Sequence, residues 1–406
     1  MRILVVSQYF WPENFQINDI VKSLVKKGIE VDVLTGKPNY PEGAIYPGYS
    51  FSGCQQEQWC GANVYRVPLI ARGVKSAFRL ALNYLSFILS GLLCGPWLLR
   101  KRHYDVIFVY GVSPILQAIP AIFLGRLKQA PVVVWVQDLW PESLSATGYV
   151  RDSSVLAWVA GIVRFIYRHT AMLLVQSRAF ESPVAALAPG KPVVYYPNSV
   201  DAAFCAPSTV AVPDVPGLGD GFSVMFAGNV GSAQAVEVMI EAAALLKDHP
   251  DICFVVLGHG SRWEWMCQEI AARNLTNVHL PGRFPVEMMP GFMQKASVLL
   301  VTLTNQPIFA MTVPNKLQAY MATGKPVVAC LNGEGARVVL EAGAGLAVTA
   351  EDAPGLADAV LRLYRMTPAE RDQMGLNGQH YFKAHYDHDS LVDQLIEHLK
   401  TVSQSS

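Results

Sequence analysis

Short apolar runs recur along the whole chain, and segments with helical periodicity separate them. The first run is Arg2–Val6. A helical pattern follows from about Ile17 to Lys27, then a glycine at Gly28 and a second run at Val31–Leu34. Strand, helix and strand in this order predict a βαβ unit with parallel strands. Further strand-like runs lie at 105–109, 131–136, 171–175, 193–195, 223–227, 252–257, 297–302 and 326–330. The pattern predicts an α/β chain built on two Rossmann-like parallel sheets.

A stretch rich in proline and glycine, residues 206–221, interrupts this alternation and predicts a linker. The charge changes sign there. Residues 1–205 carry 19 Lys/Arg against 12 Asp/Glu (+7), and residues 206–406 carry 13 against 20 (−7). We therefore expect an N-terminal domain over 1–205 and a C-terminal domain over 222–375. A helical segment over 376–406 is expected to pack back toward the N-terminal domain.

Composition excludes several classes of protein. Of the 406 residues 51% are hydrophobic and only 16% are charged, which excludes a disordered chain. The basic residues form no stripe, so no nucleic-acid partner is expected. Seven cysteines without a CxxC pair indicate free thiols in a reducing cytosol rather than a zinc site. No secretory signal peptide is expected after Met1.

Residues 80–99 contain no charged side chain. This length of about 20 residues could span a bilayer, but polar residues such as Asn83 and the helix breaker Pro96 interrupt it. Three readings stay open: a crossover helix of the domain, a helix that lies on a membrane surface, or a span. The basic cluster Arg100, Lys101 and Arg102 that follows suits anionic headgroups. It equally suits a helix C-terminus, where cations stabilise the dipole.

Two loops of the first half follow strands, so they should face a ligand at the carboxyl edge of the sheet. One loop, residues 8–15, is aromatic and carries Glu13 and Asn14. The other, residues 135–142, carries Gln137, Asp138 and Glu142. Carboxylates in such a loop can accept hydrogen bonds from sugar hydroxyls or take a proton. Packing by the aromatic residues and helix capping by Asp138 are the alternatives.

Two loops of the second half also follow strands and contain glycines. One loop holds Gly228, Asn229 and Gly231, and the other holds Gly258 with Arg262. Glycines let the backbone approach a phosphate, and Arg262 could reach it. Ordinary turn chemistry is the alternative for both loops.

The segment 311–324 is the most informative part of the second half. Thr312 is a plausible helix N-cap, and Pro314 suits a first helical turn. Free amides of that turn together with Lys316 would form an anion site suited to a diphosphate.

Taken together, these motifs resemble glycosyltransferase family 4, which has the GT-B fold of two Rossmann-like domains facing a cleft. The subgroup most similar to this sequence is the WbuB-type N-acetyl-L-fucosamine transferases of O-antigen and colanic-acid assembly. The matching stretches are Ser7–Phe15, Leu34–Gly43, Gln137–Ser143, Pro197–Asp201, Ala227–Gly231 and Val313–Gln318.

The resemblance implies a retaining transferase whose co-substrate is a nucleotide-diphospho-sugar, UDP-linked on subgroup grounds. It implies no metal and no other cofactor. The acceptor would be a saccharide on a polyprenyl diphosphate, and the protein would lie peripherally on the inner face of the cytoplasmic membrane. Asp138, Glu142 and Glu13 would orient the reacting groups. The donor would contact Gly228, Asn229, Gly231, Gly258, Arg262, Arg283, Phe284, Pro314, Asn315, Lys316 and Gln318. Acceptor and membrane would contact Asn14, Gln137, Arg100, Lys101 and Arg102.

The sequence departs from the family pattern at several positions. Many members carry two glutamates where Met311 and Ala319 stand, and cations where Asn229 and Gln234 stand. Lys316 therefore becomes the main cation expected for the diphosphate. Two alternatives remain open on sequence: a UDP-sugar 2-epimerase of similar fold, and an inactive partner that binds the nucleotide sugar in a membrane complex.

Overall fold

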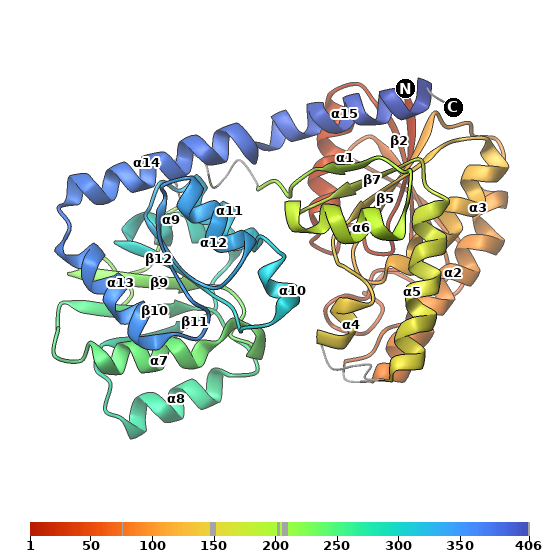
Figure 1. The fold of residues 1–406 in the computed structure, drawn as a ribbon. Coiled ribbons are helices and arrows are strands. Elements are labelled where there is room, and N and C mark those ends of the chain that lie inside the picture. The colour runs from red at the N-terminus through yellow and green to blue at the C-terminus, as the bar shows by residue number, and fades with distance from the viewer. Residues whose placement is uncertain (75, 147–151, 201–203, 205–209, 405–406) are drawn as a thin grey trace. The chain divides into compact units, whose positions relative to one another are not determined.

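The computed structural model describes residues 1–74, 76–146, 152–200, 204 and 210–404. The chain forms two compact units, and each contains a parallel sheet between helices (Figure 1). Unit 1 comprises Met1–Pro197 with Asp389–Ser406, and unit 2 comprises Asn198–His388.

Unit 1 is built on an eight-stranded sheet of order β3-β4-β2-β1-β5-β6-β7-β8. All neighbouring strands pair in parallel except β3 and β4. The strands are β1 Arg2–Val6, β2 Glu30–Thr35, β3 Gln55–Trp59, β4 Ala62–Arg66, β5 Val106–Gly111, β6 Val132–Val136, β7 Met172–Val175 and β8 Val193–Tyr195. The predicted runs of the first half thus form β1, β2, β5, β6, β7 and the edge strand β8. The hairpin β3–β4 was not predicted, because Gln55–Trp59 is mostly polar.

Helices cover both faces of this sheet. They are α1 Gln16–Lys26, α2 Ala77–Leu98, α3 Ala118–Lys128, α4 Glu142–Ala146, α5 Ser153–Arg168, α6 Glu181–Leu187 and α15 His388–Gln404, with 3-10 turns at Ile115–Gln117 and Arg178–Phe180. On one face, apolar residues of α1 and α15 pack into a core with β1 and its neighbours. On the other, α3 packs on β5, β6, α2 and α5.

Helix α2 contains the uncharged stretch predicted from the sequence. By length and composition it could cross a membrane, and only 22% of its most apolar window is buried in unit 1. The fold uses it as the crossover between β4 and β5. It is therefore a crossover helix with an exposed outer face.

Unit 2 is built on a six-stranded parallel sheet of order β11-β10-β9-β12-β13-β14. The strands are β9 Phe222–Ala227, β10 Ile252–Leu257, β11 Val278–Gly282, β12 Val298–Thr302, β13 Val327–Cys330 and β14 Gly345–Val348. The helices are α7 Val236–Leu245, α8 Trp263–Ala272, α9 Met289–Lys295, α10 Pro307–Ala310, α11 Asn315–Ala322, α12 Glu334–Glu341, α13 Ala353–Arg365 and α14 Pro368–His385, with 3-10 turns at Ser232–Gln234 and Val286–Met288. Apolar cores fill both faces of this sheet.

The boundaries between the units differ from the expected linker at 206–221. The chain leaves unit 1 directly after Pro197, and part of the expected linker, 206–209, lies outside the described residues. Val215 and Leu218 are buried in the core of unit 2, so that end of the stretch belongs to the domain. The expected C-terminal segment 376–406 also divides, because α14 belongs to unit 2 and α15 to unit 1 from Asp389 onward.

Candidate functional site

In unit 2, the loops after β9 and β10 lie against each other because the two strands are neighbours. Gly228 follows β9 with a φ of +138°, and Gly258 follows β10 with a φ of +158°. A Cβ at Gly258 would overlap the carbonyl oxygen of Gly228. A Cβ at Gly228 would lie 3.1 Å from Nζ of Lys316. Glycine is therefore required where the two backbones meet, and the β9 loop leaves its backbone open beside an amine.

Lys316 lies in the first turn of α11. The N-cap residue is Pro314, and its side chain makes no capping hydrogen bond to this helix end. Nζ of Lys316 donates a hydrogen bond to Oε1 of Gln234 (2.8 Å) and lies 3.9 Å from the centroid of the Phe226 ring. Burial lowers the pKa of Lys316 to about 7. No carboxylate forms an ion pair with it among the described residues, so the amine has room for an anionic ligand as its partner.

A hollow of about 320 Å³ opens beside this lysine. It is lined by Ser199, Val200, Phe204, Ala227, Gly228, Met289, Met293, Asn315, Lys316, Ala319 and Tyr320. Most of this lining is apolar, and Lys316 is its only charged side chain among the described residues. Such a hollow fits a ligand with an apolar ring face and one anionic group.

Two side chains that the sequence reasoning missed hold the wall of the hollow. The Tyr320 hydroxyl accepts a hydrogen bond from the Ala227 amide (2.9 Å) and so fixes the end of β9. Nδ2 of Asn198 donates to Oδ1 of Asn315 (2.9 Å). Tyr320 follows Lys316 by four residues, one turn along the same helix face, and this spacing was the available signal.

Some of the other residues predicted to contact the nucleotide-sugar donor do not line the hollow. Arg262, predicted to reach the phosphate, instead pairs with Glu237 and stacks over the Trp265 ring at 4.4 Å. Its charge is therefore already matched within unit 2. Arg283 is exposed, and the adjacent Phe284 packs on another aromatic ring of unit 2.

Three predicted positions surround the glycine loop and α11. Asn229 is exposed beside Gly231, and its side chain lies against that glycine. Gln318 is buried, does not line the hollow, and its Oε1 has no hydrogen-bond partner in the described part of the chain. Ala319 lines the hollow, so a methyl group stands where the resemblance leads one to expect a carboxylate.

In unit 1, Asp138 is held at the carboxyl edge of the sheet. Its Oδ2 accepts hydrogen bonds from the Ser113 amide (3.0 Å) and hydroxyl (2.8 Å), and that hydroxyl also accepts from Nε1 of Trp140 (3.0 Å). Asp138 follows β6 and Ser113 follows the neighbouring strand β5. The sequence reasoning missed Ser113, although its place directly after a predicted strand was the signal.

Glu13 is fully enclosed by backbone groups of two loops. Its Oε1 accepts from the amides of Asn39 (2.8 Å) and Tyr40 (2.7 Å), and its Oε2 accepts from that of Phe10 (3.1 Å). Burial raises the pKa of Glu13 to about 7 against the effect of these hydrogen bonds. With both oxygens engaged, this carboxyl positions the loops after β1 and β2.

The remaining predicted residues of this edge are closer to solvent. Glu142 begins α4 and is exposed, and Asn14 is exposed beside Glu13. Gln137 is almost buried, and its Nε2 has no hydrogen-bond partner among the residues described here.

The basic cluster lies at the opposite, amino edge of the same sheet. Asp105, a few residues on, donates its amide to the carbonyl of Arg2 at the start of β1 (2.9 Å). Arg102 is held in the domain by Asp32 (3.6 Å) and the Tyr65 hydroxyl (3.2 Å). The structure therefore separates Arg100, Lys101 and Arg102 from Asn14 and Gln137, with which they were grouped, because residues before a parallel strand and residues after it lie at opposite edges.

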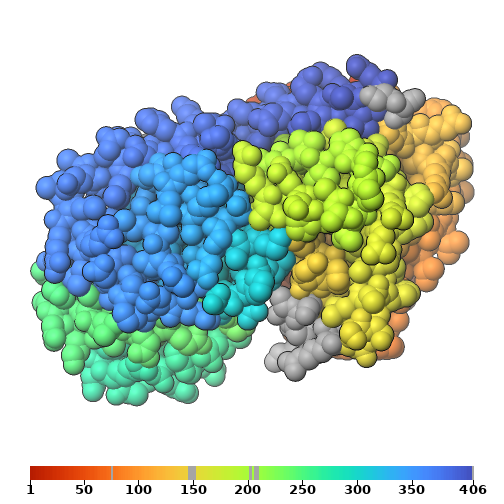
Figure 2. Space-filling view, viewed as in Figure 1, coloured from red at the N-terminus to blue at the C-terminus, as the bar shows by residue number. Residues whose placement is uncertain are grey.

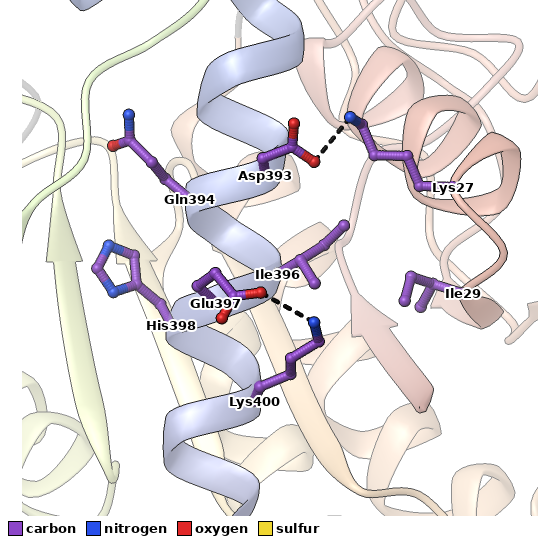
Figure 3. Close-up of a pocket in the computed structure, with 8 residues that line it drawn as sticks. All are labelled: Lys27, Ile29, Asp393, Gln394, Ile396, Glu397, His398 and Lys400. Atoms are coloured by element: carbon purple, nitrogen blue, oxygen red, sulfur yellow. Dashed lines mark hydrogen bonds and ion pairs between the residues drawn. The ribbon is translucent and has the colours of Figure 1, made fainter.

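A second hollow, of about 680 Å³, lies between α1 and α15 in unit 1 (Figure 3). Its charged groups pair with each other, Lys27 with Asp393 (2.7 Å) and Lys400 with Glu397 (2.8 Å). None of the residues from the predicted motifs lines it.

Comparisons with known proteins agree with this two-part organisation. The family model for a glycosyl transferase 4-like domain matches residues 14–199, and the model for glycosyl transferases group 1 matches residues 221–366. The chain is 27% identical over 380 residues to the Escherichia coli K12 protein named "Putative colanic acid biosynthesis glycosyl transferase WcaI", and the match covers 88% of each chain.

Two solved structures share the fold at low sequence identity. Sucrose-phosphate synthase from Thermosynechococcus elongatus superimposes with a TM-score of 0.76 at 17% identity, covering 100% of both chains. HepE of Anabaena, solved in complex with UDP, superimposes with a TM-score of 0.69 at 15% identity, covering 99% of this chain and 100% of that one. The shared architecture shows the GT-B fold, and the two matched glycosyl transferase domains together with the relative support a glycosyltransferase of family 4.

Proposed function

We propose that this protein is a retaining glycosyltransferase that moves a sugar from a UDP-sugar to a saccharide linked to a polyprenyl diphosphate, in the assembly of a cell-surface polysaccharide. N-acetyl-L-fucosamine is the donor sugar that the subgroup resemblance favours. We further propose that the protein acts in the cytoplasm at the inner face of the cytoplasmic membrane. The relative named for colanic acid biosynthesis supports the pathway class. The neighbour solved with UDP supports the nucleotide.

The observation that carries the proposal is Lys316, a buried amine at the N-terminal end of α11 that has no acidic partner among the described residues. A diphosphate there would be met by the lysine charge, by first-turn amides and by the open backbone at Gly228. These groups stabilise negative charge on the leaving diphosphate as the bond to the anomeric carbon breaks. The glycosidic bond then forms on the same face, and the acceptor hydroxyl passes its proton to an oxygen of the leaving diphosphate.

Unit 1 would supply the acceptor side. Asp138, held by the Ser113 amide and hydroxyl, keeps its second oxygen for a hydroxyl of the acceptor or of the donor sugar. Glu142 is exposed at the same edge of the sheet and can do likewise. Glu13 acts indirectly, through the two loops that it joins.

The deciding test is a product assay by mass spectrometry, with polyprenyl-diphosphate-linked N-acetylglucosamine as acceptor and a panel of UDP- and GDP-sugars. A mass gain of one sugar from a UDP donor is expected, and NMR of the product should show that the anomeric configuration of the donor is kept. Lys316→Ala should weaken UDP binding by about 10- to 100-fold, since a charge-assisted hydrogen bond contributes roughly 1.5–3 kcal/mol. The matched control is Lys247→Ala, an exposed lysine of the same unit.

Other outcomes would exclude the proposal. Epimerised donor without any acceptor would identify an epimerase. UDP binding without turnover on every acceptor and donor would identify an inactive partner. Equal UDP affinity in Lys316→Ala and in the wild type would remove Lys316 from the donor site.

A further inference from the structure

Helix α2 presents a continuous apolar row to solvent. Its members follow one another at spacings of seven, four, four and four residues along the helix, and each is more than half exposed: Phe78, Leu85, Leu89, Leu93 and Trp97. Scattered exposed apolar side chains are normal, but a contiguous row of large ones marks an interaction surface.

The packing of α2 explains why this row faces outward. A Cβ at Gly91 would lie 2.9 Å from Pro120 of α3, and Gly95 lies against Leu124 of the same helix. Asn83 is fully buried and donates to Oδ1 of Asn39 (3.3 Å) and to the Ile70 carbonyl (2.6 Å). One side of α2 is therefore fixed to unit 1, and a spanning arrangement would break these contacts.

Two neighbouring helices extend the apolar surface. Helix α3 packs on α2 and on α5, and Figure 1 shows the three helices on one side of unit 1. Exposed apolar residues are Phe123 and Leu127 on α3, and Val155, Trp158 and Phe165 on α5. Figure 2 shows α5, in yellow, at the surface of unit 1. We call the outer sides of α2, α3 and α5 the three-helix face.

The charged side chains on the three helices are all basic. None of the three helices contains an aspartate or a glutamate, whereas Arg126, Arg164 and Arg168 lie on α3 and α5. The helices run antiparallel to the strands, so their C-terminal ends meet at the amino edge of the sheet. Lys128 joins the ends of α3 and α2 there by donating to the Leu99 carbonyl (2.6 Å). The exposed Arg100 and Lys101 lie at the same end.

This arrangement favours a lipid surface over a protein partner. Cations near helix C-termini also stabilise the helix dipole, which explains their position but not the exposed apolar row beside them. A second copy of the chain would bring no carboxylate on these helices to match them. An apolar strip beside basic groups is the pattern of segments that lie in the interface of an anionic bilayer.

We propose that the three-helix face docks unit 1 on an anionic lipid bilayer, with the apolar rows at the acyl boundary and the basic ends among the headgroups. The inference deepens the proposed function, since it names the surface from which a lipid-linked acceptor would be reached. Docking itself requires no sugar transfer, so it can be tested separately.

The test is flotation of the full chain with phosphatidylcholine vesicles that contain or lack phosphatidylglycerol. The wild type should float with the anionic vesicles and be released by high salt. Leu93→Asp on α2 and Trp158→Asp on α5 should each lower the bound fraction by about fivefold or more. Lys101→Glu and Arg126→Glu should lower it on anionic vesicles alone. Leu245→Asp, a similarly exposed leucine of α7 in unit 2, should bind as the wild type does.

The proposal is overturned if the wild type does not bind anionic vesicles, or if Leu93→Asp and Trp158→Asp bind unchanged. It is also overturned if light scattering shows a dimer that Leu93→Asp dissociates while vesicles bind nothing. Transfer to a short, water-soluble acceptor separates the two proposals. Vesicle binding without any sugar transfer would contradict the proposed function and leave the docking proposal intact. Leu93→Asp should transfer normally to the soluble acceptor and poorly to one embedded in vesicles.

Discussion

At the scale of single residues, Lys316 is deeply buried and has no acidic partner in the part of the chain that the structure describes. Burial lowers its pKa from the ordinary 10.5 to about 7. The native state therefore binds fewer protons than the unfolded chain between these two values. Stability rises with pH wherever the unfolded state binds more protons. Lys316 therefore lowers the free energy of unfolding at low pH, and this destabilisation disappears as the pH rises.

The variant Lys316→Met should remove this pH dependence. Between pH 7 and pH 9 the free energy of unfolding of the wild type should rise relative to that of the variant, by up to about 1.4 kcal/mol per pH unit. Urea unfolding of both proteins without ligand measures the difference. Lys247→Met, at an exposed position, should run parallel to the wild type. A constant difference between Lys316→Met and the wild type across this range would show that Lys316 is solvated.

The partners of charged residues could not be predicted from local sequence. Lys316 could be identified because an N-terminal helix signal and a cation stood together in the sequence. The pairing of Arg262 with Glu237 could not be foreseen, because Glu237 comes from another helix. Glu13 was expected in a ligand site, and its three backbone donors come from its own loop and from the loop after β2. Contacts between segments distant in the sequence decide whether a charged side chain already has a partner. The sequence around that residue does not predict these contacts.

At the scale of elements, apolar periodicity predicted most central strands, because a strand buried on both faces must be apolar throughout. The hairpin β3–β4 was not predicted, because the edge strand β3 is mostly polar. Its turn, at Cys60 and Gly61, has positive φ at both residues. The place of α2 was left open on sequence for a different reason. An uncharged helix suits a core, a membrane surface or a span, and only its packing on α3 and the burial of Asn83 separate these.

The packing of α2 on α3 leads to a prediction with an internal control. Gly91→Ala should destabilise the protein by about 1–2 kcal/mol, because the added methyl meets the rigid ring of Pro120 at 2.9 Å. Gly161→Ala in α5 should stabilise it by about 0.5–1 kcal/mol, since an added Cβ would meet no neighbouring element of the described chain within 4 Å and alanine favours helix. Chemical denaturation of the full chain measures both. Equal effects of the two substitutions would contradict the close packing of α2 on α3.

At the scale of the whole molecule, the chain passes between the two units twice, after Pro197 and after His388. The second passage returns α15 to unit 1. There Leu391, Leu395 and Leu399 are buried in the core beside α1. The Tyr196 hydroxyl, near the end of β8, donates to the carbonyl of Leu391 (3.0 Å). The core of unit 1 is therefore complete only when α15 is in place.

Leu395→Ala should accordingly destabilise unit 1, although 395 lies in the part of the sequence that follows unit 2. The loss of a fully buried leucine should be about 2–5 kcal/mol. Hydrogen exchange followed by mass spectrometry should show faster exchange in peptides from α1 and β1, with unit 2 peptides unchanged. Leu376→Ala, at a half-exposed position of α14, should leave both units as they are. Faster exchange confined to unit 2 in Leu395→Ala would mean that α15 stabilises the unit it follows in sequence, and the chain would then consist of two independent consecutive domains.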